Sequence, residues 1–189
     1  MARSGEPTRQ RILEAAYGCF YREGFARVSV DAVAAAAGVT KRTLYYHFDS
    51  KDALLAAVLA VQHELALARI ARWGAGNEDD PAAMVEAIFT ALGKWASRPG
   101  WQGSGFTRLA MELVGLPGHP ARQAARRQKA VTEQWLARRF AGQRLPKPAA
   151  LARQVMVLLE GAMTLMLIHG DPAYARSAAL AAGVLVRRR

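Results

Sequence analysis

The abundance of alanine and the spacing of apolar residues are the features that most restrict the fold of this chain. Of its 189 residues 39 are Ala, whereas Val, Ile and Thr together number 24. Alanine is the strongest helix former, and the β-branched residues that favour strands are scarce. Apolar residues recur at i, i+3, i+4 and i+7 along the whole chain, and no stretch between turn signals alternates apolar and polar residues. The sequence therefore predicts an all-α protein.

Capping residues, glycines and prolines predict where the helices begin and end. Thr8, Ser29 and Thr40 are the expected N-caps of the first three helices, and Gly24 and Gly38 are expected to end the first two. We expect about nine helices, near residues 8–24, 29–38, 41–48, 51–73, 82–97, 104–116, 120–141, 149–169 and 173–186. The predicted domains are an N-terminal helix-turn-helix domain at 1–51, a connecting helix at about 51–73, and a larger helical domain at 74–189.

Composition narrows the class of protein. Hydrophobic residues make up 52% of the chain and charged residues 22%, so the chain can bury a core and is not a disordered polycation. No signal peptide or membrane span is expected, because the most apolar stretch, 155–168, is short for a bilayer and contains Glu160. A single cysteine, Cys19, favours the reducing cytoplasm. The net charge of +11 favours a polyanionic partner, nucleic acid before an anionic membrane.

Two short helices joined by a tight turn at Gly38 are predicted after a supporting helix. In such an arrangement the second short helix, KRTLYYHF, can enter the major groove of double-stranded DNA. Leu44 and Phe48 are expected to face inward, which leaves the polar and aromatic residues for DNA. The predicted DNA-binding residues are Thr40, Lys41, Arg42, Thr43, Tyr45, Tyr46, His47 and Lys51. The alternative is that the two tyrosines and the histidine only cover the junction with the next helix.

The run GFARVSVDAVAAAAGVTKRTLYYHFDSKDALLAAVL resembles the DNA-binding domain of the TetR family of transcriptional regulators. The similarity is most specific at 37–41 (AGVTK), at 43–48 (TLYYHF) and at Ser50-Lys51, and the strong match covers residues 8–60. The resemblance implies that residues 40–43 lie at the groove and that Lys51 contacts a phosphate. Arg42 departs from the family pattern, since many members have a small residue there, so the base preference of a relative does not transfer.

The C-terminal segments GSGFTRLAMEL, HPARQAARRQK and LLEGAMTLMLIHGDPAYARSA resemble the regulatory half of one subgroup of the family. This resemblance implies a cavity for a small-molecule effector and a homodimer formed by the last two helices. The candidate effector-binding residues are Trp95, Phe106, Leu109, Met111, Met156, Glu160 and Met163. The candidate dimer residues are Leu158, Leu159, Met166, Leu180 and Val184. Ordinary core packing is the alternative explanation for each effector candidate.

Enzyme and metal signatures are weak. Residues 102–106 (QGSGF) lack the flanking glycines of a nucleophile elbow, and no phosphate-binding loop is present. The histidines, His47, His63, His119 and His169, have neither a second ligand at i+4 nor a cysteine pair. We therefore expect no enzyme, no cofactor and no metal.

Two other functions remain open from the residues alone. One is a nucleic-acid-compacting or membrane-tethered scaffold that uses bulk charge, and it would bind DNA without regard to sequence. The other is an enzyme with an accessory DNA module. Residues 1–51 contain 8 basic and 5 acidic side chains, so a net charge of +8 lies in the larger half. Nine basic residues of that half are expected on a solvated outer face: Arg122, Arg126, Arg127, Lys129, Arg138, Arg139, Arg144, Lys147 and Arg153.

Overall fold

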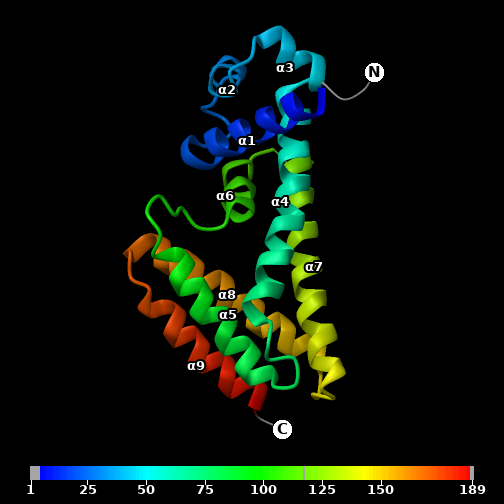
Figure 1. The fold of residues 1–189 in the computed structure, drawn as a ribbon. Coiled ribbons are helices and arrows are strands. Elements are labelled where there is room, and N and C mark those ends of the chain that lie inside the picture. The colour runs from blue at the N-terminus through cyan, green and yellow to red at the C-terminus, as the bar shows by residue number, and fades with distance from the viewer. Residues whose placement is uncertain (1–4, 117, 188–189) are drawn as a thin grey trace. The chain divides into compact units, whose positions relative to one another are not determined.

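The computed structural model describes residues 5–116 and 118–187, and these residues form nine α-helices and no strand. Figure 1 shows their order along the chain. The helices are α1 (Gly5–Glu23), α2 (Val30–Ala36), α3 (Lys41–His47), α4 (Lys51–Gly74), α5 (Pro81–Ala96), α6 (Gly105–Glu112), α7 (Pro120–Gly142), α8 (Pro148–His169) and α9 (Ala173–Arg187). The predicted all-α class is confirmed.

Two boundaries differ from the prediction. Helix α1 begins at Gly5, so Thr8 lies inside the helix and does not cap it. Pro7 fits within the first turn because the first N–H groups of a helix have no partner inside the helix. Helix α6 ends at Glu112, before the predicted residue 116, and single turns follow it, with Val114 N–H donating to the Met111 carbonyl.

The chain divides into two compact units. Unit 1 comprises the described residues up to Glu64 together with Gly105–Arg126, and unit 2 comprises Leu65–Ser104 together with the described residues from Arg127 onward. Residues 105–126, which the sequence led us to expect in the larger domain, thus pack with the N-terminal helices. A compact unit is therefore built from two stretches that are far apart in the sequence.

The core of unit 1 joins α1 to the three helices after it. Ile12, Ala16 and Phe20 face inward from α1 at helical spacing, as predicted. The buried residues contributed by α2, α3 and α4 are Val33, Ala34, Leu44, Leu54, Leu55, Val58 and Leu59. This packing supports α2 and α3, which at seven residues each are too short to be stable alone.

The core of unit 2 is formed mainly by α5, α8 and α9, with α9 packed against both of the others. Figure 1 shows these three helices grouped together. Small residues let α5 and α9 approach closely, since a Cβ added at Gly93 would lie 3.3 Å from the Cβ of Ala175. The inward stripe of α8 is apolar and includes Val155, Leu159 and Met166.

Two helices, α4 and α8, are long and apolar enough to cross a membrane when judged by length and composition alone. We had expected no such span. Part of this apolar surface is buried: Val155, Leu159 and Met166 of α8 pack in the core of unit 2, and Leu54, Leu55 and Val58 of α4 pack in unit 1. Other apolar residues of α8, such as Val157 and Ile168, are exposed, so core packing accounts for only part of the hydropathy of these helices.

Candidate nucleic-acid interface and interior polar cluster

The turn between α2 and α3 is built from the predicted capping residues. The Oγ of Ser29 accepts a hydrogen bond from Ala32 N–H at the start of α2, and Thr40 Oγ1 accepts one from Thr43 N–H at the start of α3. Gly38 adopts a φ of 64°, a left-handed conformation that glycine reaches without strain. These local contacts confirm the predicted caps and set the direction in which α3 leaves the turn.

Helix α3 has one buried side and one exposed side. Leu44 is fully buried, and Phe48, the residue that caps the helix at its C-terminus, is buried as well. Lys41, Arg42, Tyr45 and Tyr46 are exposed, and Tyr46 keeps 84% of its surface accessible. Thr43 and His47 are half-buried at the edges of this face. The predicted DNA-binding residues of α3 therefore share one side of a short helix that is anchored on the other.

Lys41 is held by an acidic residue of α2. Its Nζ lies 2.9 Å from Oδ2 of Asp31, and both side chains are largely exposed. The hydrogen bond to Asp31 and the negative charge of that carboxylate raise the pKa of Lys41. The ammonium group of Lys41 is consequently paired with a carboxylate of α2.

Lys51, at the start of α4, lies against an aromatic ring. Its Nζ is 4.2 Å from the centre of the Phe25 ring, which is close enough for a cation–π interaction. Partial burial lowers the pKa of Lys51, and the nearby carboxylates of Asp52 and Glu112 oppose this shift. Ser50 caps the same helix by accepting a hydrogen bond from Ala53 N–H. The residue predicted to contact a phosphate is thus a positioned lysine at a helix N-terminus.

Helix α6 holds the junction between α1 and α2, a role the sequence did not indicate. The carboxylate of Glu112 accepts hydrogen bonds from Phe25 N–H at 3.1 Å and from Ala26 N–H at 2.7 Å. One turn earlier, Arg108 Nη1 donates to the carbonyl of Tyr21 at 2.7 Å, in the last turn of α1. The Arg108 contact satisfies a carbonyl that the end of α1 leaves without a partner inside the helix, and the Glu112 contacts satisfy two N–H groups of the turn that follows.

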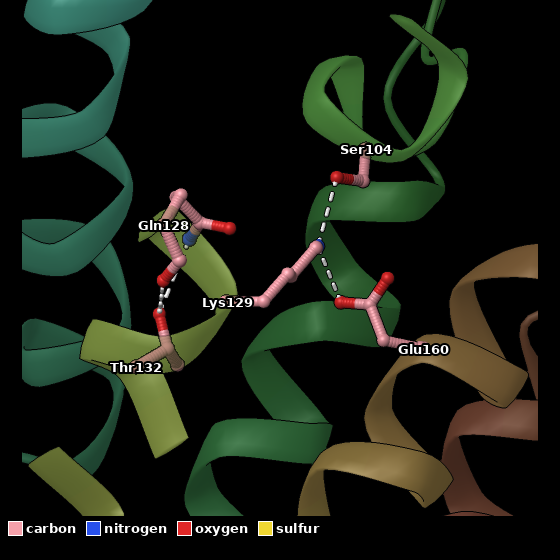
Figure 2. Close-up of polar contacts among 5 residues, drawn as sticks. All are labelled: Ser104, Gln128, Lys129, Thr132 and Glu160. Atoms are coloured by element: carbon pink, nitrogen blue, oxygen red, sulfur yellow. Dashed lines mark hydrogen bonds and ion pairs between the residues drawn. The ribbon is translucent and has the colours of Figure 1, made fainter. Parts of the chain in front are cut away.

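Unit 2 contains a polar cluster that connects α7, α8 and the loop before α6, as Figure 2 shows. Lys129 Nζ lies 2.6 Å from Oε1 of Glu160 and 3.2 Å from the hydroxyl of Ser104. The Lys129 and Glu160 side chains are each 27% exposed, so the pair is neither fully buried nor free in solvent. Lys129, which the sequence placed on a solvated outer face, is therefore part of an internal ion pair.

A second polar pair lies next to this cluster on α7. Gln128 Nε2 donates to Thr132 Oγ1 at 3.1 Å, and the Thr132 hydroxyl donates in turn to the Gln128 carbonyl. Gln128 Oε1 is buried without a hydrogen-bond partner, as is Nε1 of Trp101. Figure 2 shows Gln128 Oε1 pointing away from Thr132. Unpartnered buried polar atoms are uncommon in folded proteins.

Comparison with known proteins agrees with this arrangement. Residues 12–58 match the family described as bacterial regulatory proteins, tetR family. The regulator UidR of Escherichia coli (strain K12) is 42% identical over 69 residues, which are 36% of this chain and 35% of UidR. The regulator SrpR of Pseudomonas putida is 45% identical over 67 residues, which are 35% of this chain and 32% of SrpR.

Solved structures extend the similarity to nearly the whole chain. SCO4454, a TetR-family transcriptional regulator from Streptomyces coelicolor, superposes with a TM-score of 0.85 and 26% identity over 96% of this chain and 95% of its own. The N-terminal segment thus matches the tetR family of regulators, and nearly the whole chain has the fold of a solved TetR-family regulator. The reduced form of NemR from E. coli shares the fold, with a TM-score of 0.84 at 18% identity over 93% of this chain and 95% of its own.

Sequence similarity to the TetR-family relatives is concentrated in the DNA-binding half. The matched segment spans only about a third of the length of the curated regulators. The N-terminal helices are the part that the chain shares with these regulators.

The candidate effector residues fall in both units. Met156, Glu160 and Met163 share the inward face of α8, and Trp95 packs against the same core. Phe106 and Leu109 are buried in unit 1, and Met111 is 65% exposed there. Only the α8 residues and Trp95 are thus brought together in one core. Sequence reasoning missed Ser104, Gln128 and Trp101, because nothing in their local pattern links them to α8.

The candidate dimer residues also separate into two groups. Leu159 and Met166 are buried in the core of unit 2, because they lie on the stripe of α8 that packs within the protomer. Their side chains are not available to a second copy. Leu158 is half-buried, while Leu180 and Val184 are exposed on α9.

Within the described part of the chain, no group of three or more His, Cys, Asp or Glu side chains could hold a metal ion. Among the histidines, His119 has a structural role, since its Nδ1 accepts a hydrogen bond from Ala121 N–H in the first turn of α7. Its ring also packs edge-on against Phe25.

Proposed function

We propose that this protein is a TetR-family regulator, a cytoplasmic homodimeric repressor that is released from a palindromic operator by a small-molecule effector. The observation that carries the DNA-reading part is the two-sided character of α3. Leu44 anchors one side, and the other side presents a guanidinium, hydroxyl groups and aromatic rings. Such a helix fits the major groove, where side-chain donors read base edges.

The residues around α3 divide into two roles in this proposal. Arg42 and Thr43 face the base edges, and Arg42 can donate two hydrogen bonds to a guanine. Lys51 and His47 contact the phosphate backbone, and the first turn of α4 adds its free N–H groups. Base contacts set the sequence that is bound, whereas phosphate contacts set affinity and register.

The dimer in this proposal uses exposed apolar residues of α8 and α9. Val157, Leu165 and Ile168 follow the i, i+8, i+11 spacing of one face of α8, and Ile168 is 67% exposed. On α9, Leu180 is 74% exposed and Val184 lies one turn later. Exposed apolar residues that repeat along one face of a helix favour an interface with a second copy. A two-fold axis would present two α3 helices about 34 Å apart, one turn of DNA.

The effector in this proposal binds in unit 2, near the inward face of α8. A ligand changes operator affinity only if it binds one conformation of the protein better than the other. Effector binding therefore shifts the population of dimers away from the spacing that fits the operator.

Selection of bound sites from a library of random double-stranded DNA tests the proposal. We expect a palindromic sequence whose half-sites are separated by about one helical turn, bound by two protomers in sedimentation measurements. Recovery of no consensus, with affinity that depends on salt alone, would support the bulk-charge scaffold instead.

A further inference from the structure

The inward face of α8 is interrupted by a charge. Glu160 lies one turn from both Met156 and Met163, and both methionines are buried in the core of unit 2. A carboxylate in such a stripe loses hydration and requires a cation or several donors. Lys129 of α7 supplies the cation at 2.6 Å.

Stability alone does not explain this pair. A buried ion pair is often no more stabilising than apolar residues of the same size, because both charges lose hydration. The two side chains also retain 27% of their exposure, so solvent reaches them between the buried methionines. A charged pair that is set in an apolar core and still reached by solvent has the composition of a ligand-binding site, apolar walls with a few placed polar groups.

The excess of donors and cations in unit 2 favours an anion as ligand. Lys129 Nζ donates to both Ser104 and Glu160. Trp101, three residues before Ser104 in the same loop, has a buried indole N–H without a hydrogen-bond partner. Arg69 adds a guanidinium 4.8 Å from the ring centre of Trp95, whose ring meets that of Trp101 edge-on. Unit 2 as a whole contains 15 basic and seven acidic side chains, a net charge of +8 that DNA reading by unit 1 leaves unexplained.

We propose that Lys129 is the anchor of the effector site and that the effector is a small organic anion with an apolar body. Its acidic group takes the place of the Glu160 carboxylate at Lys129 Nζ, and its body packs on Met156 and Met163. The displaced Glu160 carboxylate turns to the solvent that already reaches 27% of its side chain. Methionine side chains adapt to varied apolar shapes. This proposal rests on the proposed effector-controlled function. It specifies that the effector is negatively charged and that Lys129 is the residue that recognises it.

Three matched probes test the charge preference: benzoate, benzamide and benzylamine, titrated into the full chain by isothermal calorimetry. We expect benzoate to bind about tenfold or more tightly than benzamide, since a hydrogen bond to a charged group contributes more than a neutral one, and benzylamine to bind weakest. Equal affinities for benzoate and benzamide, or no saturable binding of benzoate, would overturn the proposal.

Variants locate the site. Lys129→Met is expected to remove the preference for benzoate, and Lys129→Arg to retain it. Glu160→Gln is expected to strengthen benzoate binding several-fold, because the competing carboxylate is gone. Lys147→Met, at an exposed lysine of the same unit, is the matched control and should bind benzoate as the unaltered chain does. Circular dichroism checks that each variant is folded. If Lys129→Met does not fold, the benzoate affinities of Lys129→Arg and Glu160→Gln test whether Lys129 is the binding residue. The assignment of the anion site to Lys129 would be contradicted if Lys147→Met weakened benzoate binding while the Lys129 variants left it unchanged.

The operator obtained by selection separates the two claims. If benzoate binds at Lys129 and weakens operator binding, the site and its regulatory role are both supported. If benzoate binds there without changing operator affinity, the anion site stands and its role as the effector site is overturned. Failure of the chain to bind any DNA specifically would overturn the proposed function, while the preference for benzoate over benzamide would still report on Lys129.

Discussion

Asp31 and Lys41 form an ion pair of 2.9 Å that spans the turn between α2 and α3. A lysine at the start of a DNA-reading helix is thereby directed toward a neighbouring carboxylate. We predict that Asp31→Asn strengthens binding to random DNA and makes the logarithmic salt dependence steeper by about one counterion, because Lys41 becomes free to contact a phosphate. Fluorescence anisotropy across a salt series measures both quantities.

The control for this change is Asp49→Asn, which removes an exposed acid just after α3 and leaves Lys41 paired. Both variants raise the net charge by one. If they strengthen binding equally, the effect comes from net charge and the ion pair has no special role.

Arg42 and Lys51 are predicted to act differently on DNA. Arg42→Ala should weaken operator binding by about 1–3 kcal/mol and broaden the set of accepted sites, because a base-reading donor is lost. Lys51→Ala should weaken binding to all sequences and reduce the salt slope by about one. Binding measured in parallel on operator and random DNA checks this, and equal losses on both DNAs for both variants would refute the division of roles.

Glu112 is predicted to stabilise unit 1 through the backbone of Phe25 and Ala26. Glu112→Gln keeps the shape of the side chain but places an amide donor against one of the two N–H groups. We expect a loss of about 1–3 kcal/mol in the free energy of unfolding, measured with urea. Glu64→Gln, an exposed acid of the same unit, should change stability little. A loss of equal size in both variants would argue against the contact.

The exposed residues Ile168 and Leu180 are predicted to lie in the dimer interface. Replacing either by Glu should shift the sedimentation coefficient toward that of a single protomer and reduce operator affinity at least about tenfold, since a buried unpaired charge is costly. Val114→Glu alters an equally exposed apolar residue in unit 1 and is expected to remain dimeric. Dimers that persist in both interface variants would place the interface elsewhere.

Local features of the fold could be predicted from the sequence because they depend on neighbouring residues. The caps at Ser29 and Thr40, the turn at Gly38 and the inward position of Leu44 each follow from a few residues in order. The start of α1 was placed too late, since Pro7 is as compatible with a first helical turn as with the residue before one.

Contacts between distant segments could not be predicted in this way. The hydrogen bond between Ala26 and Glu112 joins residues that are 86 positions apart, and the one between Lys129 and Glu160 joins residues 31 apart. Helical periodicity contains no information about either pair. Lys129 was grouped with exposed arginines because charge predicts a solvated face unless a partner is known. The sequence also could not separate the core residues of α8 from those available to a second copy. The helix is apolar nearly all round, and its sequence does not show which side packs within the protomer.

The assembly of unit 1 from two separated stretches has a consequence for synthesis on the ribosome. Residues that hold the end of α1, Arg108 and Glu112, emerge only after α5 has been made. The backbone N–H of Phe25 therefore cannot bond to Glu112 until all of α4 and α5 has left the ribosomal tunnel. At typical rates of translation, about 5–20 residues per second, this is a delay of roughly 4–17 s. Full stabilisation of the turn after α1 is thus tied to the synthesis of a segment that lies 86 residues further along the chain.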